Sequence, residues 1–190
     1  IFHCFQYKIR PGPDPKRMEA TEHMTDVDLR LEVMKPSQQW LDIGQGELGK
    51  VHVEILGCEG LPNMDSGGFL GNKTDAFVSV VFEDAFARTD VIDDCLSPHF
   101  MPWTNRAFIL SMAHPSSTLN LAVFDYDDGL LDDHDLIGRV SVDLSTLVPD
   151  TEYVLHYNLY PSHRISSREV QGRIKIRLRM EFHDERKLAL

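Results

Sequence analysis

The 190-residue chain has few cysteines, no long apolar run and no excess of positive charge. Its three cysteines, Cys4, Cys58 and Cys95, form no CxxC or CxxH spacing, so the sequence predicts neither a disulfide framework nor a zinc site. Thiols that stay reduced favour a cytoplasmic location. No apolar stretch reaches the roughly 20 residues that a membrane-spanning helix needs, and the apolar start is too short for a signal-peptide core. Because the chain does not begin with Met, we expect it to be processed or to be part of a larger protein.

Acidic side chains outnumber basic ones, with 30 Asp and Glu against 19 Lys and Arg and a net charge of −11. A surface of this sign repels nucleic-acid phosphates, which argues against a nucleic-acid partner. It also repels an anionic bilayer unless a cation intervenes. The chain has no GxSxG, HExxH, Walker A or Rossmann glycine pattern, and its nine histidines are dispersed. We therefore expect no catalysis in this chain.

The hydrophobic content of 42% is sufficient for one domain with its own core, plus an arm. Residues 1–26 contain Pro11, Pro13 and Pro15 among scattered charges and have no regular hydrophobic period, so we interpret them as an irregular N-terminal arm. We expect a domain over residues 27–183 and a C-terminal tail over residues 184–190.

Alternating hydrophobic residues predict short strands along this domain. Val27, Leu29, Leu31 and Val33 alternate with charged residues, which predicts a half-buried strand. Similar runs occupy residues 50–57, 76–83, 88–93, 104–110, 119–124, 136–142 and 173–182. Short helical turns are expected at residues 143–147, with Asp143 as the cap, and at residues 37–41. Eight short strands predict an all-β fold, an eight-stranded antiparallel β-sandwich.

The last strand has a basic face. Ile174, Ile176, Leu178, Met180 and Phe182 should point inward, and the basic row Arg173, Lys175, Arg177 and Arg179 should point outward. Such a row can contact anionic lipid or an acidic partner, but charged rows also protect sheet edges from aggregation. We favour the second interpretation. If the first and last strands are neighbours, Asp28 and Glu32 can pair with the basic row.

The most acidic segment, residues 125–135, holds six aspartates and no Lys or Arg. Each close carboxylate pair costs about 1 kcal/mol in water, so a divalent cation is expected to compensate. Ca²⁺ suits oxygen ligands in flexible loops. An EF-hand loop needs Gly at position 6 and Glu at position 12. Counting from Asp125 places Gly129 at position 5 and Leu136 at position 12, so an EF-hand does not fit. A solvated acidic loop remains the alternative.

Five segments in order resemble the motifs of a C2 domain. They are LPNMD at 61–65, KTDAFV at 73–78, LSPHFMPW at 96–103, VFDYD at 123–127 and HDLIG at 134–138. The resemblance covers about residues 49–182. It implies an eight-stranded antiparallel sandwich whose loops at one end bind Ca²⁺ and phospholipid, and the 27–33 run would be the N-terminal strand of the synaptotagmin-like topology.

The same resemblance implies a set of metal ligands. Asp65 and Asp75 would serve from the first loop, and Asp125, Asp127 and Asp135 from the third. Both loops are a few residues longer than the usual pattern, so Asp132 or Asp133 could replace Asp135. Ala76 stands where the family commonly has proline, which affects loop stiffness more than ligand number. Pro98 and Trp103 would be structural.

Apolar residues lie in the middle of both acidic loops. They are Phe69 and Leu70 in the first loop and Leu130 and Leu131 in the third. Burying each fully contributes about 1.5 to 3 kcal/mol, enough for four inserted side chains to drive membrane docking. The alternative is that they fold back onto the sandwich.

Two functions follow from these features. The first is a Ca²⁺-dependent module that binds anionic phospholipid membranes and is peripheral on the membrane when calcium is bound. The second is a protein-interaction or scaffold domain that binds partners through the N-terminal arm, with structural calcium or none.

Overall fold

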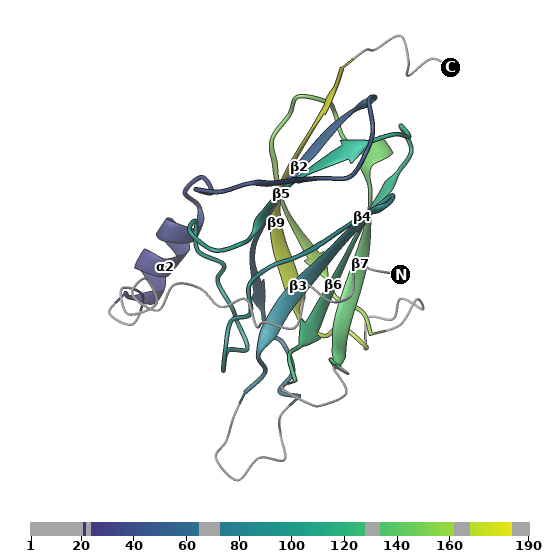
Figure 1. Cartoon of the computed structure of the whole chain (residues 1–190). Coiled ribbons are helices and arrows are strands. Elements are labelled where there is room, and N and C mark those ends of the chain that lie inside the picture. Colours follow the sequence, from purple (N-terminus) through teal and green to yellow (C-terminus); the bar gives the residue numbers. More distant parts are fainter. Residues whose placement is uncertain (1–20, 22–23, 65–72, 128–133, 162–167, 184–190) are drawn as a thin grey trace.

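The structure is a computed structural model that describes residues 21, 24–64, 73–127, 134–161 and 168–183. In these residues, two β-sheets face each other to form a sandwich, and one helix lies beside it (Figure 1). The predicted β-sandwich class is therefore confirmed.

The larger sheet has five strands in the order β1-β5-β2-β9-β8. Their bounds are Leu41–Ile43, Ala107–Met112, Gly49–Glu59, Arg173–Phe182 and Tyr153–Asn158. The smaller sheet has the order β4-β3-β6-β7, with bounds Ala85–Arg88, Ala76–Phe82, Thr118–Asp125 and Leu136–Asp143. Among the described strands, β1 pairs with β5 in parallel and every other pair is antiparallel.

The core lies between the sheets and is built from alternating residues of facing strands. Val51, Val53 and Ile55 of β2 are fully buried beside Ile176 and Leu178 of β9. The predicted alternation of the last strand is correct for Ile174 through Met180, and Phe182 at its end is only partly buried. Asp143 caps the short 3₁₀ helix Leu144–Thr146, as expected.

The predicted strand at residues 27–33 is wrong, because these residues form the helix α2 (Asp26–Val33). Thr25 starts the helix with a capping box, in which its side chain accepts from the Asp28 N–H and the Asp28 side chain accepts from the Thr25 N–H. Asp26 and Asp28 in the first turn also suit the positive end of the helix dipole. Local capping at Thr25 therefore favours a helix over the strand that the alternating pattern predicted.

The C-terminal strand, β9, pairs with β2 in the larger sheet. β9 runs antiparallel beside β2, with Val53 opposite Leu178. The predicted strand at residues 88–93 is wrong, because β4 already ends at Arg88, and the strand predicted at 104–110 begins only at Ala107. Strands β1 and β8 were not predicted. Residues 37–40 are not helical, and Leu41 begins β1.

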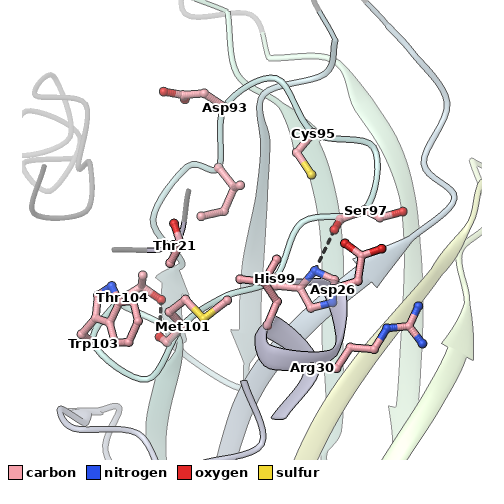
Figure 2. A pocket seen from close by; sticks show the side chains of 12 residues that line it. Thr21, Asp26, Arg30, Asp93, Cys95, Ser97, His99, Met101, Trp103 and Thr104 are labelled. Carbon is pink, nitrogen blue, oxygen red and sulfur yellow. Dashed lines mark hydrogen bonds between the residues drawn. The ribbon is translucent and has the colours of Figure 1, made fainter. Parts of the chain in front are cut away.

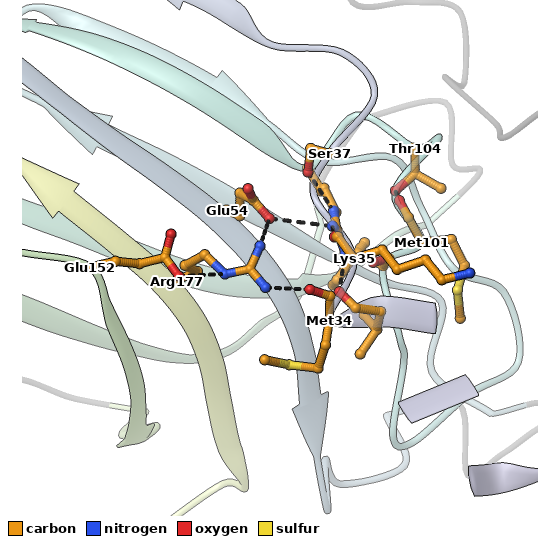
Figure 3. A network of polar contacts seen from close by, with 11 residues as sticks. Met34, Lys35, Ser37, Glu54, Met101, Thr104, Glu152 and Arg177 are labelled. Atoms are coloured by element: carbon orange, nitrogen blue, oxygen red, sulfur yellow. Dashed lines mark hydrogen bonds and ion pairs between the residues drawn. The ribbon is translucent and has the colours of Figure 1, made fainter. Parts of the chain in front are cut away.

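Two arginines fix helix α2 to the sandwich (Figure 3). Arg106, which is fully buried, donates to the carbonyl oxygens of Val33 and Lys35, and Arg177 donates to that of Met34. Both also bond the buried carboxylate of Glu54, at 3.3 and 2.8 Å. Because helix C-terminal carbonyls lack partners within the helix, this arginine clamp satisfies them and anchors α2.

Candidate metal centre

The predicted ligands that the structure describes lie at one end of the four-stranded sheet, the lower end in Figure 1. Asp75 precedes β3, Asp125 ends β6, and Asp135 precedes β7. These strands are antiparallel neighbours, so the start of β3 and β7 meets the end of β6. Asp127 follows two residues after Asp125. The other predicted ligands, Asp65 and Asp133, with its neighbour Asp132, and the predicted tips, Phe69, Leu70, Leu130 and Leu131, lie outside the described residues.

Hydrogen bonds hold the described ligands together. The Asp125 Oδ1 atom accepts from the Asp75 N–H at 2.7 Å, and the Asp75 carbonyl accepts from the Tyr126 N–H at 2.9 Å. The Asp135 carbonyl accepts from the Asp125 N–H at 2.8 Å. Asp125 is buried with 2% exposure, Asp75 and Asp127 are half-buried and Asp135 is exposed. Exposure of these residues therefore increases from Asp125, at the end of the sheet, to Asp135, which faces solvent.

A neighbouring loop positions the Asp75 carboxylate. Its Oδ1 atom accepts from the backbone N–H of Asp94 at 2.8 Å, and Asp94 in turn accepts from the Lys73 N–H. Asp94 has a left-handed backbone with φ of 57°, which aims its N–H at this carboxylate. Nothing in the sequence marked Asp94, because its role depends on how the 89–106 connection returns to β3.

Thr74 brings the start of the first loop to the same place. Its fully buried hydroxyl donates to the Pro62 carbonyl at 2.8 Å and accepts from the Met64 N–H at 3.0 Å. Met64 directly precedes Asp65. Thr74 thus holds the start of the first loop beside Asp75, and the Asp75–Asp125 hydrogen bond joins the start of the third loop to the same place.

A cluster of rings packs beneath the third loop. Phe77 stacks on Phe124 with centroids 5.5 Å apart, and His134 stacks on Tyr126 at 4.7 Å. The His134 Nδ1 atom accepts from the Asp127 N–H at 3.2 Å. The sequence did not reveal that His134 fixes the ligand-bearing backbone through this bond.

The donor chemistry of this site fits a hard cation. Its described side chains offer carboxylate oxygens, which are the ligands that Ca²⁺ prefers. The Nδ1 atom of His134, a nitrogen that a transition metal would favour, already accepts the Asp127 N–H. Within the described part of the chain, no three His, Cys, Asp or Glu side chains are already gathered in metal-binding geometry.

The basic row is largely paired with acids. Arg173 contacts Glu59 at 3.3 Å, Arg177 contacts Glu54 at 2.8 Å, and Arg179 contacts Asp150 at 3.2 Å and Glu181 at 3.3 Å. These partners differ from Asp28 and Glu32, which were expected on the assumption of an N-terminal strand. Pairing of this kind weakens the row as an anion site.

Comparison with known proteins identifies the family. The family model of the C2 domain matches residues 49–159, more than half of the chain. The chain belongs to the C2 domain family. C2 domains are generally membrane- or lipid-binding modules without catalytic activity of their own. In the residues that the structure describes, no helix is long and apolar enough to cross a bilayer.

Solved structures agree on the fold. The first C2 domain of plant extended synaptotagmin 1 is 22% identical with a TM-score of 0.60, and the match covers 74% of this chain and all of that one. A calcium-bound structure of the two C2 domains, A and B, of extended synaptotagmin 2 is 20% identical, with a TM-score of 0.55 over 74% of this chain and 47% of that one. Human GIVD cytosolic phospholipase A2 is 18% identical with a TM-score of 0.57, and the match covers 74% of this chain but only 17% of that enzyme. No curated protein matches the sequence significantly.

Proposed function

We propose that this C2 domain binds anionic phospholipid membranes in a Ca²⁺-dependent manner and is peripheral on the membrane. The observation that carries the proposal is the network that joins Asp75, Asp125 and Asp135 at one end of the sandwich. The similarity to a calcium-bound extended synaptotagmin 2 structure supports it.

Asp75, Asp125 and Asp127 would hold the metal, with Asp65 and Asp135 or Asp133 completing the set. When bound, Ca²⁺ supplies positive charge and open coordination for phosphate oxygens. Without it, these carboxylates repel anionic head groups, since charges of one sign at an exposed surface oppose binding.

The apolar residues of both loops would provide the second part of the binding energy. In the sequence, Phe69 and Leu70 lie between the predicted ligands of the first loop. Leu130 and Leu131 lie between those of the third loop. Once the acidic rim is neutralised, their insertion removes apolar surface from water. Binding should therefore need both the carboxylates and the apolar tips.

Co-sedimentation with phosphatidylserine-containing liposomes, in calcium and in chelator, tests the proposal. The double variant Leu130→Asp with Leu131→Asp should lose the calcium-dependent pelleting of the parent chain. Val148→Asp with Val154→Asp is the matched control, because it adds the same charge at positions that are 61% and 43% exposed elsewhere. Pelleting that is absent in both conditions would overturn the proposal.

One observation favours the protein-interaction alternative. Helix α2 leaves Val27 and Leu31, one turn apart, 65% exposed. Under this alternative, Asp125→Asn with Asp127→Asn leaves partner binding intact, whereas under the membrane proposal it abolishes lipid binding.

A further inference from the structure

A groove of about 550 Å³ separates helix α2 from the connection between β4 and β5 (Figure 2). Leu29, Ile92, Met101 and Trp103 give it apolar walls. Asp26 and Asp93 add two acidic side chains and Arg30 one basic side chain, so acidic groups are in excess. The volume lies in the range of roughly 300–1,000 Å³ that is typical of ligand sites.

Hydrogen bonds within the described residues hold both walls of the groove in place. The arginine clamp fixes α2 through the carbonyls of Val33, Met34 and Lys35. The opposite wall is joined to β3, because Ile92 exchanges two backbone hydrogen bonds with Ala76 and the Cys95 N–H donates to Thr74. The groove is therefore preformed, which reduces the entropy cost of filling it.

We propose that this groove is filled by the chain's own segment 15–18, Pro-Lys-Arg-Met. The first argument is connectivity, since Thr21 itself lines the groove. Met18 is three residues before Thr21, and an extended chain covers at most about 3.6 Å per residue. Met18, Arg17 and Lys16 are thus within about 18 Å of a residue already at the rim.

The second argument is chemical fit. Lys16 and Arg17 can pair with Asp26 and Asp93, and a guanidinium can also stack on an indole such as Trp103. Met18 suits the apolar wall, because its flexible thioether adapts to irregular surfaces and to aromatic edges.

The third argument is charge at larger scale. Residues 1–20 carry a net charge of +2, against −11 for the whole chain, which leaves −13 for residues 21–190. Opposite charges draw the segment toward the domain. The short tether also keeps it at an effective concentration on the order of millimolar, so that individually weak contacts suffice.

Trp103 provides a direct reporter. The chain has two tryptophans, so in a Trp40→Phe background all tryptophan fluorescence comes from the groove. Acrylamide quenching of the full chain should rise at least twofold when Lys16→Glu and Arg17→Glu are introduced together. Adding Asp93→Lys to that variant should restore most of the protection, since it recreates an opposite-charge pair.

Lys8→Glu with Arg10→Glu is the matched control, because it changes the same charge in the same arm outside the proposed segment. It should leave quenching unchanged. Equal quenching in the parent chain and the Lys16 and Arg17 variant would overturn the proposal, as would an equal effect of the control. Protection that depends on protein concentration would also overturn it, because the occupant would then be a second copy. Unchanged thermal melting shows that each variant is folded.

Discussion

The carboxylate of Asp125 accepts a 2.7 Å hydrogen bond from the backbone N–H of Asp75. This bond joins the end of β6 to the start of β3. It places the buried carboxylate of Asp125 next to Asp75, the residue through which the first loop enters β3. One oxygen of Asp125 is thus used for structure, and its negative charge remains at the site. Charge and geometry can be separated here, because an asparagine Oδ1 atom can accept the same bond.

Asp125→Asn with Asp127→Asn should lower Ca²⁺ affinity at least about tenfold, because affinity in oxygen sites depends on ligand charge. Isothermal titration calorimetry with Ca²⁺ measures this directly. Asp84→Asn, in the turn at the far end of β3, removes one negative charge away from the site and should leave the affinity unchanged. Equal affinities for the double variant and the parent chain would exclude these residues as ligands.

Calcium should also stabilise the fold. A ligand that binds only the native state adds about 2.7 kcal/mol at a hundredfold excess over Kd, which corresponds to an increase in Tm of about 5 to 10 °C for a domain of this size. Differential scanning calorimetry in millimolar CaCl₂ and in chelator gives the value, with MgCl₂ as the control for ionic strength. An unchanged Tm would count against a native calcium site.

Arg106→Met should destabilise the domain strongly. Arg106 is fully buried, and its burial lowers its pKa to about 10 while Glu54 opposes the shift. Losing it leaves the Val33, Lys35 and Phe100 carbonyls without its donors, and breaking such a buried network costs about 3 to 5 kcal/mol. Urea unfolding measures this loss. Arg173→Ala breaks an exposed pair and should cost less than about 1 kcal/mol; similar losses for both variants would contradict a structural role for the clamp.

Glu83 should make stability depend on pH. Its burial alone raises the pKa of the carboxyl, but hydrogen bonds from Ser117, His114 and Ala113 outweigh this and lower the pKa below its ordinary 4.5. The folded pKa is depressed, so the stabilisation is present above about pH 4.5 and is lost as pH falls through the lower folded value. Glu83→Gln should therefore reduce the free energy of unfolding more at pH 7 than at pH 3.

Urea titrations of the parent chain and Glu83→Gln at both pH values test this dependence. Glu169→Gln, at an exposed position, is the control and should change stability little. A Glu83→Gln effect that is the same at pH 3 and pH 7 would show that the carboxylate's charge is not involved.

Much of the fold could be predicted from the sequence because β9 and the strands of the smaller sheet have clear alternation. Helix α2 could not, since its valines and leucines follow a period of two and form no continuous apolar face of a helix, so that only Val33 in it is buried. Two observations decide the matter: the Thr25 capping box, which is local, and the bonds from Arg106, more than 70 residues away. β8 alternates half-buried Tyr153, Leu155 and Tyr157 with exposed residues, a signal that was present in the sequence.

The candidate site was predictable in its residue types and only partly in its construction. The acidic pairs predicted the ligand residues, and the antiparallel register places Asp75, Asp125 and Asp135 at the same sheet end; that these residues bind a metal stays a prediction. The supporting bonds from Asp94 and to His134 depend on the return of distant loops, which no local pattern encodes.

The central claim is calcium-dependent membrane binding, and energy transfer from tryptophan to dansyl-labelled vesicles tests it most directly. With phosphatidylserine vesicles, a calcium titration should give a saturable signal that chelator reverses and that Asp125→Asn with Asp127→Asn abolishes. Neutral phosphatidylcholine vesicles should give a much weaker signal, because the neutralised site attracts anionic head groups. A signal of equal size in chelator, or none at any calcium concentration, would contradict the account.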